Sequence, residues 1–246
     1  MTALLRAELL KLRTTRTIYG YLLLLVVLSA LRAVVLATSA HIFDLEDPSY
    51  QRDLLSQSVA APLTALLIGI LSVTVEWRHG TITRTLLVSP RRWRMLVAKE
   101  VNASLVGVLL ALLGVAVTIS VAAPILSRDG SPFVVDGPFL TRIGDIVLAS
   151  ALWGALGVGV GALVQHQAGA LVGTILWVAI VESLADPLLQ WAGAPGIADV
   201  LPRHALDALA GHEHGLSPAV GGSVGLLYVV AFAALAFARV RRQDVT

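Results

Sequence analysis

Long apolar runs separated by short polar stretches dominate the order of residues in this chain of 246 residues. Six runs approach the roughly 20 apolar residues that a helix needs to cross a bilayer. Unbroken runs of this length satisfy their backbone hydrogen bonds as helices, and strand-like alternation is absent, so the pattern predicts an all-α polytopic membrane protein with one transmembrane domain over residues 1–246. The predicted spans are residues 18–40, 59–75, 101–126, 143–164, 168–184 and 219–238.

The segments between the spans are short, and one of them has an unusual composition. Residues 41–57 and 127–142 are acidic and contain Pro, and we expect both to be loops. Residues 185–218 instead contain short apolar pieces interrupted by prolines. Such pieces are too short to cross a bilayer and would gain nothing in water, so they predict re-entrant or interfacial helices between the fifth and sixth spans.

The first 17 residues are basic and precede the first span. Leu5, Leu9 and Leu12 share one helical face, which favours an amphipathic helix on the membrane over a flank that only fixes topology. The basic start, the apolar run and the small residues 37–40 also fit a cleavable signal peptide. The long charged leader and Arg32, which interrupts the apolar run, argue against cleavage.

Composition supports the membrane assignment and removes several classes of chemistry. Charged residues make up 14% of the chain, whereas soluble domains contain about 25%. Hydrophobic residues make up 57%, which agrees with several buried or lipid-facing spans. Because the chain has no cysteine, disulfides, thiolate metal sites and cysteine nucleophiles are excluded.

Basic residues are concentrated at the N-terminus, after the second span and at the C-terminus, which six spans place on one side of the membrane. These regions hold 13 of the 18 Lys and Arg residues, while most acidic residues lie on the opposite side. Because cytoplasmic flanks carry the excess of Lys and Arg, we expect both termini to be cytoplasmic. The 13 residues are Arg6, Lys11, Arg13, Arg16, Arg78, Arg84, Arg91, Arg92, Arg94, Lys99, Arg239, Arg241 and Arg242.

No catalytic motif is present. The glycines of GVGVG (residues 157–161) lie inside an apolar span without a following Lys-Ser/Thr, so they predict close helix packing rather than phosphate binding, as do Gly169 and Gly173. The cluster His204, His212 and His214 lacks the HExxH spacing, and whether it binds a metal stays open. We therefore expect no enzyme activity in this chain.

Arg32 is a cation inside the first span. It lies about 20 Å along the helix from Ile18, nearer the outer face. Its side chain can extend to the outer interface, or it can line a polar pathway, since charges inside membranes often mark substrate routes. Glu182 and Asp186, near the outer end of the fifth span, are candidate counter-charges.

The basic segment between the second and third spans has an ordered series of local signals. Glu76 closes the second span, Gly80 and Thr81 form a turn, and an apolar edge follows on a short helix. Ser89 and Pro90 then predict a cap and the start of a second helix that leads into the third span. A lipid-binding loop explains the arginines but not this order, which is better suited to docking on a cytoplasmic partner.

This segment and the stretch ELLKLRTTRT (residues 8–17) resemble the ABC-2 type permease subunits of bacterial ABC exporters. In that family an acidic residue ends the second helix, and a Gly-Thr-Ile-like turn, a Leu pair and a Ser-Pro-Arg stretch ending in Lys follow. The resemblance assigns ATPase coupling to Glu76, Arg78, His79, Gly80, Thr81, Ile82, Arg84, Leu86 and Leu87, and a second cytoplasmic helix to Ser89, Pro90, Arg91, Arg92 and Lys99.

The resemblance also implies partners. It implies a separate ATPase subunit that carries ATP and Mg²⁺, a second permease chain, and a location in the bacterial inner or plasma membrane. No cofactor is expected in this chain, and its partners would include membrane lipids but no nucleic acid. The mostly aliphatic spans fit export of a hydrophobic or amphipathic substrate such as a drug, antibiotic, peptide or lipid. The alternative is a sensor or assembly protein that uses the same basic loop on lipid or another partner.

Overall fold

The computed structural model describes residues 16–39, 47–80, 92–128, 133–212 and 215–241. Every secondary-structure element in these ranges is a helix, which confirms the predicted all-α fold. The predicted N-terminal interfacial helix lies almost entirely outside the described residues. The coupling residues Thr81, Ile82, Arg84, Leu86, Leu87, Ser89, Pro90 and Arg91 also lie outside them.

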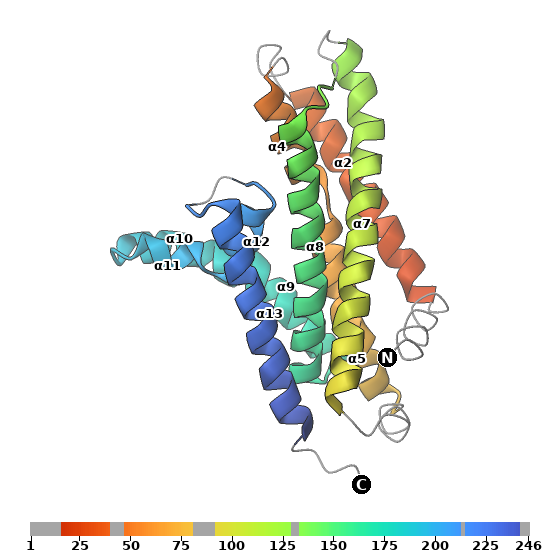
Figure 1. Cartoon of the computed structure of the whole chain (residues 1–246), viewed down its shortest axis with the longest axis vertical. Coiled ribbons are helices and arrows are strands. Elements are labelled where there is room, and N and C mark those ends of the chain that lie inside the picture. Colours follow the sequence, from red (N-terminus) through yellow and green to blue (C-terminus); the bar gives the residue numbers. More distant parts are fainter. Residues whose placement is uncertain (1–15, 40–46, 81–91, 129–132, 213–214, 242–246) are drawn as a thin grey trace.

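Six helical segments are long and apolar enough to cross a membrane, as the hydrophobic pattern predicts. The segments run along a common direction, except that the fifth turns away from the others part-way along (Figure 1). Several extend beyond the predicted apolar runs, because the helical backbone continues into the polar flanks. They cover Thr17–Ser39, Pro48–Arg78, Trp93–Arg128, Gly137–Val164, Gln167–Trp191 and Pro218–Arg241.

The first three segments contain four helices. They are α2 (Arg16–Ser39), α4 (Pro48–Ser58), α5 (Ala61–Arg78) and α7 (Arg92–Arg128). The predicted second cytoplasmic helix is not separate in its described part, because α7 runs without interruption from Arg92 through the third span.

The prediction of a loop over residues 41–57 is wrong for its second part, where α4 forms. Asp47 caps this helix by accepting a hydrogen bond from the Ser49 amide at 2.8 Å, and Pro48 begins the first turn. The exposed Asp47 carboxyl has a pKa below its usual range, chiefly because of this backbone hydrogen bond. Leu54 and Leu55 are buried against neighbouring helices, so tertiary contacts stabilise a segment whose composition is polar.

The remaining segments contain α8 to α13. α8 (Gly137–Val164) is followed by a tight turn in which Gln165 is left-handed and His166 caps α9 (Gln167–Leu176). A π-helix, η1 (Trp177–Val181), joins α9 to α10 (Glu182–Trp191) without a break. The short helices α11 (Pro195–Asp199) and α12 (Pro202–Leu209) and the last span α13 (Pro218–Arg241) follow.

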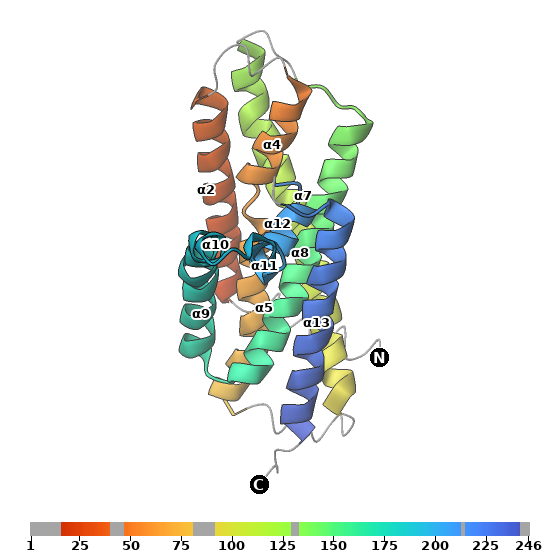
Figure 2. The ribbon, with the colours of Figure 1, turned by 90° about the vertical axis from the view of Figure 1, so that its left-hand side faces the viewer.

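The arrangement of α9 to α12 agrees with the short helices predicted between the fifth and sixth spans. α10 and α11 project sideways from the bundle, and α12 returns to pack against α8 and α13 (Figures 1 and 2). The tip of this projection is strongly exposed, with 89% of Trp191 accessible. The fifth span differs from its prediction in one respect, because the helix continues past residue 184 and includes Pro187.

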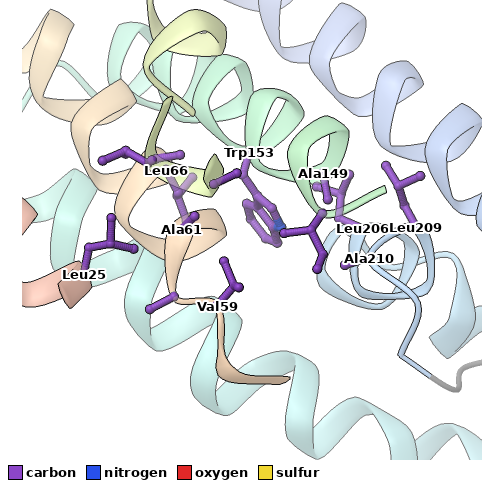
Figure 3. Packing of buried hydrophobic residues seen from close by; sticks show 14 of the residues in the cluster. Leu25, Val59, Ala61, Leu66, Ala149, Trp153, Leu206, Leu209 and Ala210 are labelled. Atoms are coloured by element: carbon purple, nitrogen blue, oxygen red, sulfur yellow. The ribbon is translucent and has the colours of Figure 1, made fainter. Parts of the chain in front are cut away.

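The core lies where α5 and α8 pack together, with α7 beside them (Figure 3). Leu66 of α5 and Trp153 of α8 are buried in this cluster, together with Leu206 from α12. Gly157 faces the backbone of Leu66, and Gly161 faces that of Ile70, so a β-carbon at either position would collide with α5. This contact confirms their predicted packing role, whereas a β-carbon at Gly173 would meet no atom of the described residues within 4 Å, so no close packing is seen there.

Charge differs between the two ends of the bundle. Arg78 ends α5, Arg94 lies at the start of α7, and Arg239 is in the last turn of α13; we call this the basic end (Figure 1). Asp47 and Asp136 cap helices at the opposite end, which we call the acidic end.

Candidate functional site

A buried ion pair joins α5 to α7 at the basic end. Lys99 Nζ lies 2.9 Å from Glu76 Oε1 and donates a second hydrogen bond to the Ser72 carbonyl at 2.8 Å. The Lys99 side chain is fully buried, and 8% of the Glu76 side chain is exposed. Residues 81–91 connect the two helices, so the pair fixes both ends of the segment to which the resemblance assigns coupling.

A buried apolar cluster lies in the same part of the bundle as this ion pair. Val73 of α5, Met95 of α7 and Val158 of α8 form one buried cluster at this end of the bundle. Two charges removed from water lose hydration worth several kcal/mol each, and close geometry with further hydrogen bonds is needed to offset the loss. The Ser72 carbonyl supplies such a bond. The pair therefore fixes the relative position of the two helix ends more than it adds net stability.

The other described coupling residues lie next to this pair. Arg78 Nη1 donates to Gln167 Oε1 at 3.1 Å, which ties the end of α5 to the start of α9. His79 contacts the Val75 carbonyl through Nδ1 at 2.9 Å. Gly80 has a φ of +64°, a left-handed conformation that glycine adopts without strain, in agreement with the predicted turn.

A second buried polar cluster surrounds Glu182, whose side chain is fully buried. Glu182 Oε1 accepts a hydrogen bond from Trp177 Nε1 at 2.8 Å, and Oε2 accepts one from the Arg203 amide at 2.8 Å. In an α-helix residues five apart point in different directions, because about 3.6 residues make a turn. The wider π turn brings Trp177 and Glu182 to one face, and π-bulges are frequent at functional sites.

His204 connects the two predicted pathway acids. Its Nε2 lies 3.0 Å from Asp186 Oδ2, and its Nδ1 lies 3.7 Å from Glu182 Oε2. The imidazole is almost completely buried, with 4% of its side chain exposed. The hydrogen bond to Asp186 ties α12 to α10, and the ring also lies close to the Glu182 carboxylate.

Arg203 adds three contacts to the same cluster. Its Nη1 donates to Ser183 Oγ at 2.9 Å and to the Val178 carbonyl at 3.2 Å, and its Nε pairs with Asp207 at 3.3 Å. The Val178 carbonyl lies within the π-helix, so this contact holds α12 against the irregular turn. Together these bonds make η1, α10 and α12 one unit.

The structure does not pair Arg32 with its predicted counter-charges. Arg32 is exposed on α2, and in the ranges that the structure describes no hydrogen bond or ion pair joins it to Glu182 or Asp186. Asp207 of α12 is the acidic residue whose charge acts on Arg32. Within the described residues, the contacts of Glu182 and Asp186 come from Trp177, Arg203 and His204 instead.

Sequence reasoning missed Trp177, Arg203 and Asp207 as members of this cluster. The available signal was a series of polar residues after Pro202 within an otherwise apolar segment. His204 was considered only with His212 and His214. His212 Nδ1 instead lies 3.2 Å from the Asp207 carbonyl, His214 is outside the described residues, and no metal-binding group of three His, Asp or Glu occurs within the described ranges.

Comparison with known proteins adds no assignment, since no family model and no curated protein match this chain. The structure itself establishes an all-α chain with six helical segments fit to span a membrane and two buried polar clusters, one near the basic end and one between η1, α10 and α12.

Proposed function

We propose that this chain is the transmembrane subunit of an ATP-driven exporter whose ATPase is a separate polypeptide. The observation that supports the proposal most is the buried Glu76–Lys99 pair. A partner that pushed residues 81–91 would act on two helix ends that this pair holds together. Because α5 also packs against α8, such a displacement would reach the centre of the bundle rather than one loop.

The competing function, a lipid-bound sensor or assembly protein, needs only exposed arginines in this segment. Anionic lipid attracts a polybasic loop without any buried charge. A buried ion pair is of little use to such a loop, because its desolvation cost can exceed its Coulombic gain. The pair therefore favours a segment that transmits position over one that only adheres to lipid.

The proposal includes an orientation and a second permease chain. We place the basic end in the cytoplasm of a bacterial cell, with both termini there, because Lys and Arg concentrate at that end. A charge within a span usually faces a protein interior or a water-filled path. The exposed Arg32 would meet this condition at a path between two permease chains.

The proposed substrate is a hydrophobic or amphipathic molecule. Described residues of α2 and α9 expose mainly aliphatic side chains, including Leu23, Val27 and Ile175. A path lined by such surfaces offers few hydrogen-bond partners to a strongly charged solute. Arg32 and the Glu182 cluster would form its polar part.

Co-purification tests the proposal. The chain would be expressed with a Walker-motif ATPase from a neighbouring gene, and residues 80–87 would be exchanged for a Gly/Ser linker. We expect the exchange to abolish co-purification, while Gly-Gly-Ser in place of residues 192–194, of which 192 and 193 are exposed, leaves it unchanged. Survival of the complex after the first exchange would contradict the coupling assignment.

Transport in vesicles separates the two functions. The co-purified complex would be reconstituted and loaded with an amphipathic fluorescent dye, and dye movement would be followed after addition of ATP or a non-hydrolysable analogue. An exporter moves the dye or a competing substrate only with ATP. A stable complex without ATP-dependent movement of any amphipathic compound tested would favour the sensor or assembly function.

A further inference from the structure

An open pocket of about 500 Å³, which we call the cavity, lies toward the acidic end of the bundle. It is lined by Arg52 of α4, by the first residues of α8 and by Pro218 at the start of α13. Thr141, Arg142 and Asp145 are the polar residues that α8 contributes. The volume lies within the range of small-molecule sites, about 300–1,000 Å³.

Two guanidinium groups from different helices line this cavity, and each lies farther from its carboxylate partner than a hydrogen bond would place it. Arg52 Nη1 lies 3.6 Å from Asp136, and Arg142 Nη2 lies 3.9 Å from Asp53. Charge-assisted N–H···O bonds are shorter, about 2.7–2.9 Å. Arg142 Nη1 also donates to the Ala210 carbonyl at 3.3 Å, which holds its side chain in place. Each guanidinium carries five N–H donors, so both retain donors for a ligand.

Asp145 gives the cavity an acceptor of opposite charge. Its side chain is half-buried, and within the described residues it has no hydrogen bond and no ion pair. Arg142, three positions earlier on α8, acts on it only through its charge. An ionised carboxylate accepts hydrogen bonds and donates none, so its natural partner is an N–H group.

The cavity lies along the first turns of α8, near one end of a segment long enough to span a membrane. α8 has 28 residues and is about 42 Å long, whereas the hydrocarbon core of a bilayer is about 30 Å thick. The helix is therefore longer than the hydrocarbon is thick, and a turn or more at its ends can lie among the headgroups. Pro218 lines the same cavity where the last span begins, so the cavity opens where two helices enter the membrane.

From these observations we infer that the cavity binds a phosphoethanolamine group. Phosphate oxygens would accept hydrogen bonds from Arg52 and Arg142, and the ammonium would donate to Asp145. A phosphocholine group fits the arginines equally well but has no N–H for the carboxylate. The group could belong to a membrane lipid or to a soluble molecule, and the inference does not depend on the proposed transport function.

Lipid retention tests the inference on the purified full chain. Native mass spectrometry would compare phosphatidylethanolamine, phosphatidylcholine and phosphatidylglycerol at equal concentration. We expect about tenfold greater retention of phosphatidylethanolamine than of phosphatidylcholine, the size expected for one hydrogen bond between charged groups. Equal retention of these two lipids by the unaltered protein would overturn the inference.

Three variants assign the effect to the cavity. Asp145→Asn is expected to remove the preference for ethanolamine over choline, and Arg52→Gln to reduce retention of all three phospholipids. The matched control is Arg128→Gln, an exposed arginine at the end of α7 that does not line the cavity. Thermal unfolding identifies any variant that fails to fold, and in that case the lipid comparison on the unaltered protein decides alone.

Competition with soluble O-phosphoethanolamine distinguishes a lipid headgroup from a soluble molecule as the source of the bound phosphoethanolamine group. Displacement of the retained lipid by this compound, but not by phosphocholine, would show that the site accepts the free molecule. Retention of the lipid in the presence of excess O-phosphoethanolamine would assign the site to a headgroup presented by the bilayer. An Asp145→Asn variant that kept the full preference for ethanolamine would refute the assignment to this cavity.

Discussion

Lys99 Nζ lies 2.9 Å from Glu76 Oε1, although 23 residues separate the two in sequence. Both side chains are buried beside apolar residues of α5, α7 and α8. The geometry differs from that of an exposed basic loop, where charges remain hydrated and an ion pair contributes little. It gives the segment between α5 and α7 two ends that are held in a fixed relation.

Removal of one member of this pair should destabilise the protein more than removal of both. Lys99→Met leaves a buried carboxylate without its cation, and breaking a buried pair costs about 3–5 kcal/mol. The double variant Glu76→Leu with Lys99→Met leaves no uncompensated charge. We expect it to unfold at a higher SDS fraction than either single variant.

The measurement for this pair is SDS titration followed by circular dichroism. Arg239→Gln, an exposed arginine at the same end of the bundle, is the control and should change stability by less than about 0.5 kcal/mol. Single variants as stable as the unaltered protein would show that the ion pair is not maintained in solution.

Loss of the hydrogen bond from Trp177 to Glu182 should lower the free energy of unfolding more than the same substitution at an exposed tryptophan. Trp177→Phe keeps an aromatic ring but removes the donor to a fully buried carboxylate. The expected loss of unfolding free energy is about 1–3 kcal/mol. Trp191→Phe is the matched control, because 89% of Trp191 is exposed, and should have almost no effect. Equal behaviour of the two variants would contradict the described π-helix geometry.

Glycine substitution should distinguish the α5–α8 contact from an exposed helix face. A β-carbon at Gly157 would collide with the Leu66 carbonyl, so Gly157→Ala should lower stability by separating two helices. A β-carbon at Gly173 would meet no atom of the described residues within 4 Å, so Gly173→Ala should be neutral, or stabilising by up to about 1 kcal/mol through helix propensity. Thermal unfolding in detergent measures both. A tolerant Gly157 and a sensitive Gly173 would instead place the helix contact on α9.

The cap of α4 should make this helix sensitive to acid. Because the folded pKa of Asp47 lies below its unfolded value, the stabilisation is present above the unfolded pKa and is lost as the pH falls through the folded pKa. Asp47→Asn keeps a good capping side chain but cannot titrate. Hydrogen exchange of the amides of residues 49–52, corrected for intrinsic rates, should increase at low pH in the unaltered chain only. Identical pH profiles would exclude Asp47 as the cause.

The sequence predicted local features at the candidate sites better than their pairings. Glu76 and Lys99 were recognised separately, one as the end of the second span and the other as part of the second cytoplasmic helix. Their direct contact depends on how α5 and α7 pack, which no local pattern encodes. The same is true of Glu182, whose Oε2 is bonded by a residue 21 positions away in α12.

The hydrophobic pattern also failed where burial depends on neighbours. α4 contains enough polar residues to resemble a loop, and only contacts with surrounding helices bury Gln51, Leu54 and Leu55. Polar side chains of α4 also form hydrogen bonds with residues outside the helix. Tyr50, for example, donates to the Leu36 carbonyl of α2 at 2.8 Å.

The sequence by itself determined six spanning helices, the segregation of basic residues to one end and the close approach at Gly157 and Gly161. These features follow from local quantities, namely run length against bilayer thickness, charge near span ends and the absence of a side chain. Tertiary structure alone decided the partners of Lys99, Glu182 and Arg203, because buried charges take whichever complementary group packing brings within reach. The length of an apolar run determines where along the sequence a helix forms, whereas the packing of helices determines which polar groups come into contact.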